Sequence, residues 1–421
     1  MKDNSHRFDL SDRLIHFFRE VNLEGDSAPL IQPEHFAFNS YVEGTKWPAL
    51  FLLRCAVRSH RLWATWSMRK GVRTVYGPRP AVCFSEMPIG AFLEASMKRE
   101  AAGQAMSPYA LTFLKTAMHE VGTNPVIYGL ADRNAVLPKG IGGVPRLMKA
   151  NILPPHEQYR YVTYNPSGPL KVDWLHEREW RWPYNGDLSK IENELQEYGI
   201  VSDAADIPGF DFAGQGLQGI GIIVKTEDDA RKLSCDVLTL IDKGEVSPRH
   251  FDHILVINRL PSPLQLVSPN AVDAAISEAL LDFSHYFGLP EKDVEQVLQD
   301  FSARVSAIEQ GAPKVVEKPI EKGGCWLWVH DNTHPYVRAL IQAGRVTVNN
   351  EGRYVASLDE LCPQRELRQR QELADKLAKQ LSKELGVGGG FFSVLNSSNP
   401  SDIPFYIGRP PEDDLYHNTD H

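Results

Sequence analysis

The chain has 421 residues, of which 42% are hydrophobic and 24% are charged, which supports a full hydrophobic core and predicts two or three domains. The formal net charge of -9 and the pI near 5.9 exclude a protein whose whole surface binds nucleic acid, but a local basic groove stays compatible with them. The sequence begins with polar residues and has no run near the ~20 apolar residues of a membrane helix, so we expect a cytoplasmic protein without a membrane partner.

The cysteines point to a reducing compartment. Five of them are widely spaced, and none forms a C-x-x-C pair, which is typical of reduced and mostly buried thiols. Cys325 precedes His330 and His334, and His417 precedes His421, but neither group has a second thiolate or a carboxylate at ligand spacing. We therefore expect no metal site.

The first predicted element is the apolar run at residues 14–19. As a strand it places His16 on one face and Arg19 on the other. On residue type alone, we favour a core strand or helix start in which His16 hydrogen-bonds a carbonyl, over a functional histidine.

A basic and aromatic stretch follows at residues 47–73, which predicts a helix or strand with one basic aromatic face. An apolar segment, 50–53, passes into a sequence rich in arginine and tryptophan, including Arg54, Arg58 and Trp66. Such a face can stack on bases and contact phosphates, or it can be a solvated face whose arginine stems cover apolar surface. We favour the solvated face.

Two further segments suggest the lining of a cleft. Residues 80–88 predict a short buried strand that ends at Ser85 and Glu86, and small polar residues at such an end are well placed to line a cleft. After a helical pattern, Tyr109 begins a strand or helix, and residues 124–128 predict another short strand.

The most unusual stretch is residues 174–182, WLHEREWRW. As a strand it places Glu177, Glu179 and Arg181 on one face and Trp180 and Trp182 on the other. Because the indoles favour burial, we expect the charged face to look into a groove or an ion-pair network. Arg181 then either binds a phosphate or neutralises Glu179.

The rest of the chain divides by composition. A helix at 188–198, strands at 220–224 and 251–256 and a helix at 227–243 complete a mixed α+β domain that ends near 262. The G-x-G-x-x-G at 214–219 precedes a strand instead of following one, so we interpret it as a loop. We expect a helical segment at 263–310, a linker at 311–324 and a small α/β module at 325–421, with helices at 335–343 and 365–385 and a strand at 345–348.

Four segments of the first domain together resemble the AbiGi-like abortive-infection family of bacteria, with looser similarity to DarT-type ADP-ribosyltransferase-like proteins. They are residues 14–19, residues 82–88, Tyr109 with residues 124–128, and residues 177–181. The resemblance implies a split-sheet ADP-ribosyltransferase-like domain over about 1–262, with NAD as substrate and a role in anti-phage defence. It also implies transfer to a nucleic acid or protein acceptor.

The same resemblance implies roles for individual residues. His16 would hold the NAD ribose, Ser85 and Tyr109 are candidates for the nicotinamide side, Glu179 would polarise the ribose hydroxyl, and Glu177 would face the acceptor. Two arginines, Arg19 and Arg181, complete the predicted cofactor-binding set. A carboxylate near the ribose stabilises the oxocarbenium-like state formed when nicotinamide leaves.

A second function stays open at this point. Proteins of the resembled family also act as antitoxins, so the chain is alternatively a non-catalytic antitoxin or assembly subunit that binds a toxin or another partner protein. From the residues alone, we favour a structural ion pair between Glu179 and Arg181, and the resemblance adds the catalytic alternative.

Overall fold

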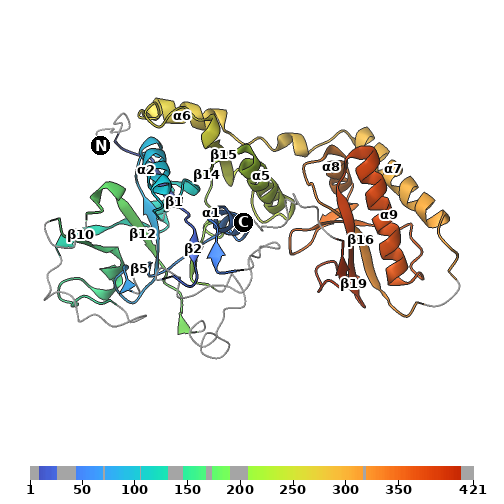
Figure 1. The fold of residues 1–421 in the computed structure, drawn as a ribbon, viewed down its shortest axis with the longest axis horizontal. Helices are drawn as coiled ribbons and strands as arrows, with labels where there is room; N and C mark the ends of the chain where they lie inside the picture. Colours follow the sequence, from blue (N-terminus) through green and yellow to red (C-terminus); the bar gives the residue numbers. More distant parts are fainter. Residues whose placement is uncertain are drawn as a thin grey trace. The chain divides into compact units, whose positions relative to one another are not determined.

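The structure is a computed structural model, and it describes residues 9–25, 44–69, 72–104, 106–130, 146–166, 173–189, 207–315 and 319–408. The chain forms two compact units, one of residues 1–233 and 247–281 and the other of residues 234–246 and 282–418 (Figure 1). Both units combine helices with a sheet, so the predicted α+β class is confirmed. Most of the helix predicted at 188–198 falls outside the described residues.

The first unit is built on a seven-stranded sheet. In spatial order its strands are β9 (Asn124–Pro125), β12 (Glu179–Pro183), β7 (Ala81–Ser85), β1 (Arg13–Phe17), β8 (Ala110–Leu114), β14 (Ile220–Val224) and β15 (Phe251–Val256). Every neighbouring pair is antiparallel except β14 with β15. The ladder between β1 and β8 has five residue pairs, whereas that between β1 and β7 has one, Ile15 with Ser85. The sheet is therefore weakly joined at its centre.

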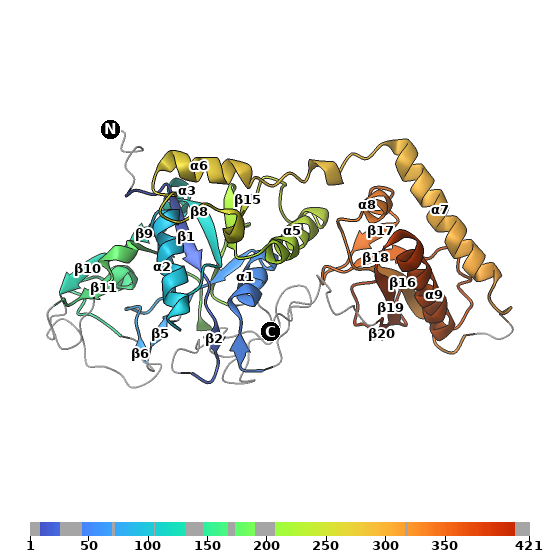
Figure 2. The same ribbon diagram turned by 45° about the horizontal axis from the view of Figure 1, so that its top comes forward.

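Different layers cover the two faces of this sheet. On one face, α2 (Ile89–Ala101) and α6 (Pro269–Glu278) pack against Ile15, Ile223 and Leu255 (Figure 2). On the other face, the ring of Phe210 from β13 (Gly209–Asp211) meets those of Phe84, Phe113 and Trp182. Strand β13 pairs with β4 (Arg61–Trp63), which follows α1 (Ala49–Arg58).

The shorter elements of the first unit complete its framework. They are β2 (Val21–Asn22), β3 (Lys46–Trp47), β5 (Met68–Arg69), β6 (Val72–Arg73), α3 (Lys115–Glu120), β10 (Ile127–Leu130), η1 (Pro155–Arg160), β11 (Tyr161–Tyr164), η2 (Leu175–Glu177) and η4 (Ile257–Arg259). Residues 214–219 form a loop before β14, as predicted.

The basic stretch after residue 47 differs from its prediction. Its first part is α1, and both Arg54 and Arg58 are buried within it, so these arginines belong neither to a solvated face nor to an exposed nucleic-acid surface. Arg73 lies over the ring of Trp66, 3.9 Å from its centroid. These arginines therefore pack inside the first unit. Burial of Arg54 and Arg58 and the cation–π contact of Arg73 take the place of hydration by solvent.

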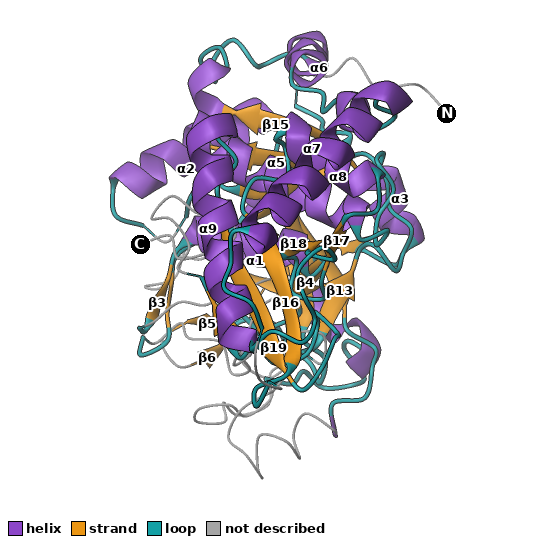
Figure 3. Ribbon diagram, turned by 90° about the vertical axis from the view of Figure 1, so that its right-hand side faces the viewer, coloured by secondary structure: helices purple, strands orange, loops and turns teal. Residues whose placement is uncertain are grey.

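The second unit is a five-stranded antiparallel sheet with helices. The strand order is β17 (Val346–Val348), β18 (Tyr354–Ser357), β16 (Gly323–Val329), β19 (Gly389–Leu395) and β20 (Tyr406–Ile407). Its helices include α7 (Glu291–Gln310), α8 (Pro335–Gln342) and α9 (Leu367–Leu385), and α9 lies along β16 and β19 (Figure 3). Helix α9 ends at Gly386, whose φ of 75° is the left-handed conformation that glycine adopts without strain.

The predicted helical segment and linker are distributed over both units. Helix α6 packs in the core of the first unit, whereas α7 supplies Phe301 and Val305 to the core of the second. The 3-10 helix η5 (Ser284–Tyr286) lies between them in sequence, and the predicted linker runs into β16.

A buried polar network connects α5 (Glu227–Asp242) with the rest of the second unit. Arg338 donates two hydrogen bonds to Asp242, at 2.6 and 2.9 Å, and their side chains are only 3% and 2% exposed. Tyr354 also donates to Asp242, at 2.5 Å, and Asn332 donates to Thr239 and the carbonyl of Cys235. The segment 234–246 thus belongs to the second unit, and its side of this network is buried there.

Within the described ranges, every helix is either too short or too polar to cross a lipid bilayer.

Candidate functional site

The stretch 174–182 changes direction in its middle. Strand β12 begins at Glu179, whereas Glu177 belongs to η2, and Arg178 between them has a φ of 45°. The prediction that Glu177 shares a strand face with Glu179 and Arg181 is therefore wrong, because the left-handed residue turns the chain before the strand starts. Instead, Glu177 pairs with Arg99 of α2, at 3.3 Å.

Arg181 is the most deeply buried charge of this strand. Its Nε and Nη2 donate to the two carboxylate oxygens of Glu179, at 2.8 and 3.2 Å, and its Nη1 donates to the carbonyl of Tyr159, at 2.6 Å. Burial opposes the charged form of Arg181, but the Glu179 carboxylate and the neighbouring Cys83 outweigh it and raise the pKa of the guanidinium. The geometry matches the predicted alternative in which Arg181 neutralises Glu179.

The two carboxylates keep partial access to solvent. The side chains of Glu179 and Glu177 are 15% and 17% exposed, against 5% for Arg181. Tyr128 accepts from the backbone N–H of Glu179 and donates to the carbonyl of Trp174, at 3.3 and 3.2 Å. These bonds connect the start of β12 to η2, so that both carboxylates are held at one end of the strand.

Cys83 is a site residue that the sequence interpretation missed. It pairs with Arg181 across β7 and β12, as Ser85 pairs with Glu179, so these four side chains share one face of the sheet. Burial, followed by the negative charge of Glu179, raises the pKa of the Cys83 thiol, while Arg181 acts in the opposite direction. The thiol is therefore protonated at neutral pH and suits a structural role better than a nucleophilic one.

His16 lies at the weak centre of the sheet. Its Nδ1 donates to the carbonyl of Cys83, at 2.9 Å, so the predicted bond to a backbone carbonyl is confirmed. Because Ile15 pairs with Ser85, His16 points to the opposite face from Glu179, and its ring packs edge-on against Phe18 and Phe84. Desolvation lowers the pKa of His16 to about 4.

We expect His16 to remain neutral over the physiological pH range. The pKa of His16 is lower in the folded than in the unfolded state, so the folded state binds fewer protons. The free energy of unfolding should therefore fall as the pH falls from about 6.5 towards 4. The 13C shift of the imidazole, assigned with a His16→Gln variant, will report the titration. A midpoint between pH 6 and 7 in the folded protein would contradict the desolvation of the imidazole ring.

The other predicted binding residues have structural partners. The hydroxyl of Ser85 donates to the backbone carbonyl of Glu177, at 2.7 Å, which ties β7 to η2. The hydroxyl of Tyr109 donates to Asp229, at 3.1 Å. Arg19 is half-buried just beyond the end of β1.

The structure thus gathers only part of the predicted set. Glu177, Glu179, Ser85 and Arg181 lie together at one end of β12 and β7. The side chain of His16 lies on the opposite face of the sheet, and its hydrogen bond to the backbone carbonyl of Cys83 connects it to this group. Tyr109 precedes β8, which is three strand positions from β12 in a sheet whose neighbouring strands lie about 4.8 Å apart.

In the part of the chain that the structure describes, no three His, Cys, Asp or Glu side chains are grouped so as to hold a metal ion.

Comparison with known proteins identifies one region. Residues 289–419 match the family described as "Protein of unknown function (DUF4427)", and the described residues of this match lie in the second unit. Neither the curated proteins nor the solved structures contain a match to the chain.

Proposed function

We propose that the first unit is an NAD-dependent ADP-ribosyltransferase-like domain that modifies a nucleic acid or protein acceptor in bacterial anti-phage defence. The observation that carries the proposal is the pair of partly exposed carboxylates, Glu177 and Glu179, beside the point where the β1–β7 ladder ends. Arg181 holds Glu179 in one orientation from the buried side. Such preorganisation is what electrostatic stabilisation of a developing charge requires.

In the proposed reaction, the bond between nicotinamide and C1′ of the ribose breaks, and its electron pair leaves with nicotinamide. The positive charge that develops on the ribose is stabilised by Glu179. An acceptor nucleophile then forms the new bond to C1′, and Glu177 takes its proton.

A second function is favoured by a different observation. Both oxygens of Glu179 accept from Arg181, and His16 lies on the other face of the sheet. This arrangement suits a non-catalytic antitoxin or assembly subunit that retains the fold and binds a partner protein.

Incubation of the full chain with NAD labelled in its adenylate, in lysate from phage-infected cells, separates the two functions. We expect transfer of label to a macromolecule, and a loss of about 10²–10³-fold in Glu179→Gln, the range for removing one group that stabilises transition-state charge. Glu94→Gln, the same change at an exposed carboxylate of α2, should keep full activity.

Glu177→Gln should reduce transfer to the acceptor while hydrolysis of NAD continues, because water then replaces the acceptor. Two results would assign the chain to the binding role. Either no label is transferred, or Glu179→Gln transfers as much label as the unaltered chain.

A further inference from the structure

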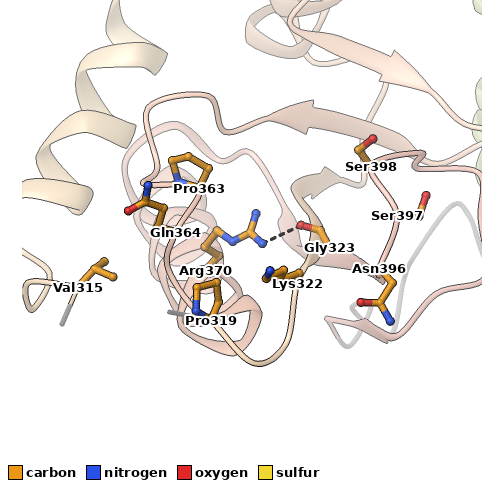
Figure 4. Close-up of a pocket in the computed structure, with 10 residues that line it drawn as sticks. All are labelled: Val315, Pro319, Lys322, Gly323, Pro363, Gln364, Arg370, Asn396, Ser397 and Ser398. Atoms are coloured by element: carbon orange, nitrogen blue, oxygen red, sulfur yellow. Dashed lines mark hydrogen bonds between the residues drawn. The ribbon is translucent and has the colours of Figure 1, made fainter. Parts of the chain in front are cut away.

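A pocket of the second unit lies far along the chain from the carboxylates of β12. Its volume is about 870 Å³, which falls in the range of small-molecule sites (Figure 4). It is lined by the residues around the start of α9, the start of β16 and the segment after β19, namely Val315, Pro319, Lys322, Gly323, Pro363, Gln364, Arg370, Asn396, Ser397 and Ser398. All of them fall within the range 289–419 that matches the family of unknown function.

Two cationic side chains contribute to the lining of this pocket. Figure 4 shows Arg370 between Lys322 and Gln364, with its Nη2 donating to the carbonyl of Gly323, at 2.7 Å. The Nε of Arg370 is buried and has no hydrogen-bond partner among the described residues. A buried guanidinium N–H without an acceptor is costly, and the negative charge of an anion beside the guanidinium would offset part of that cost.

The acidic groups near the pocket already have partners. Glu366 accepts from the backbone N–H groups of Ile320 and Glu321, and the carboxylate of Glu321 pairs with Arg368. Asp402 accepts from Ser397 and Asn399. The charges of the lining side chains themselves are both positive, from Arg370 and Lys322.

We propose that this pocket binds an organic phosphate of nucleotide size. Arg370 offers a planar donor to phosphate oxygens and Lys322 a second positive charge, which together suit a group with more than one negative charge. The prolines and Val315 provide apolar surface for the body of the ligand, and Gln364, Asn396 and Ser398 provide polar contacts. The proposal does not depend on the reaction proposed for the first unit.

Calorimetric titration of the full chain with ADP, and with adenosine as the phosphate-free compound, tests this site. We expect saturable binding of ADP and at least tenfold weaker binding of adenosine. Arg370→Gln should weaken ADP binding by about 10–100-fold, since hydrogen bonds to charged groups contribute about 1.5–3 kcal/mol. Lys379→Gln, which removes an equal charge from an exposed position of α9, should leave binding unchanged.

Two further variants make the outcome unambiguous. Lys322 is exposed, so Lys322→Gln should weaken binding without changing the unfolding midpoint, even where Arg370→Gln lowers that midpoint. Arg231→Gln, which removes a positive charge from an exposed position of the first unit, should leave binding unchanged. Equal affinity for adenosine and ADP, no saturation by 1 mM ADP, or equal losses in the Arg370 and Lys379 variants would overturn the proposal.

Discussion

Replacement of Arg338 by alanine is expected to lower the free energy of unfolding of the second unit by about 3–5 kcal/mol, the cost of breaking a buried ion pair. The side chain of Asp242 is only 2% exposed, and without Arg338 its carboxylate would keep the neutral hydroxyl of Tyr354 as a donor. The guanidinium also donates to the carbonyl of Tyr286, at 3.0 Å, and that bond is lost as well. Urea denaturation followed by tryptophan fluorescence will measure the change.

A matched control for Arg338→Ala exists in the same unit. Lys379 pairs with Asp375 on α9, but its side chain is 77% exposed, so Lys379→Ala should cost at most about 0.5 kcal/mol. Because Asp242 lies outside the range 289–419, a fragment that begins at residue 282 should be destabilised in the same way as Arg338→Ala. Equal stability of the Arg338 and Lys379 variants would show that the buried pair contributes nothing beyond an exposed one.

Arg181→Ala is expected to destabilise the first unit by about 3 kcal/mol, at the lower end of the cost of breaking a buried pair. The lower value follows from the partial exposure of Glu179, which lets water reach the unpaired carboxylate. The change also removes a donor from the carbonyl of Tyr159. Thermal and urea unfolding of the full chain will measure it.

A double variant separates the ion pair from the packing around it. Arg181→Leu combined with Glu179→Leu leaves no unpaired charge, so it should be more stable than Arg181→Leu alone. Arg231, which pairs with Asp228 at an exposed position, supplies the control, and Arg231→Ala should change stability by less than about 0.5 kcal/mol. A double variant that is less stable than Arg181→Leu would contradict a dominant role for charge pairing.

The helices and strands that the sequence predicted best are those with strong local patterns. The apolar runs at 220–224 and 251–256 became β14 and β15, and the periodic segment after residue 365 became α9. The G-x-G-x-x-G at residues 214–219 was correctly predicted to be a loop. The motif stands directly before a strand, and this is visible in the neighbouring sequence. Each of these outcomes depends on side chains within one element.

The candidate site was only partly predictable. The sequence identified Glu179, Arg181 and Ser85, since alternation within a strand and the ends of strands are visible in it. The prediction that Glu177 shares the strand face of Glu179 was wrong. The left-handed conformation of Arg178 causes this difference, and it cannot be predicted from the residue type arginine. The sequence interpretation missed Cys83, whose role follows from its pairing with Arg181 across two strands that are about a hundred residues apart.

The pattern of residues along the chain was enough to predict the α+β class, the main strands and helices, and the charged run that begins β12. Which charged side chains are buried, and which partners they pair with, depends on how the strands and helices pack together. Arg54, Arg181 and Arg338 look like ordinary cations in the sequence, yet all three are buried. The reason is physical: periodicity reports the face on which a side chain lies, whereas the free energy of a charge depends on partners and desolvation that strand pairing and packing supply.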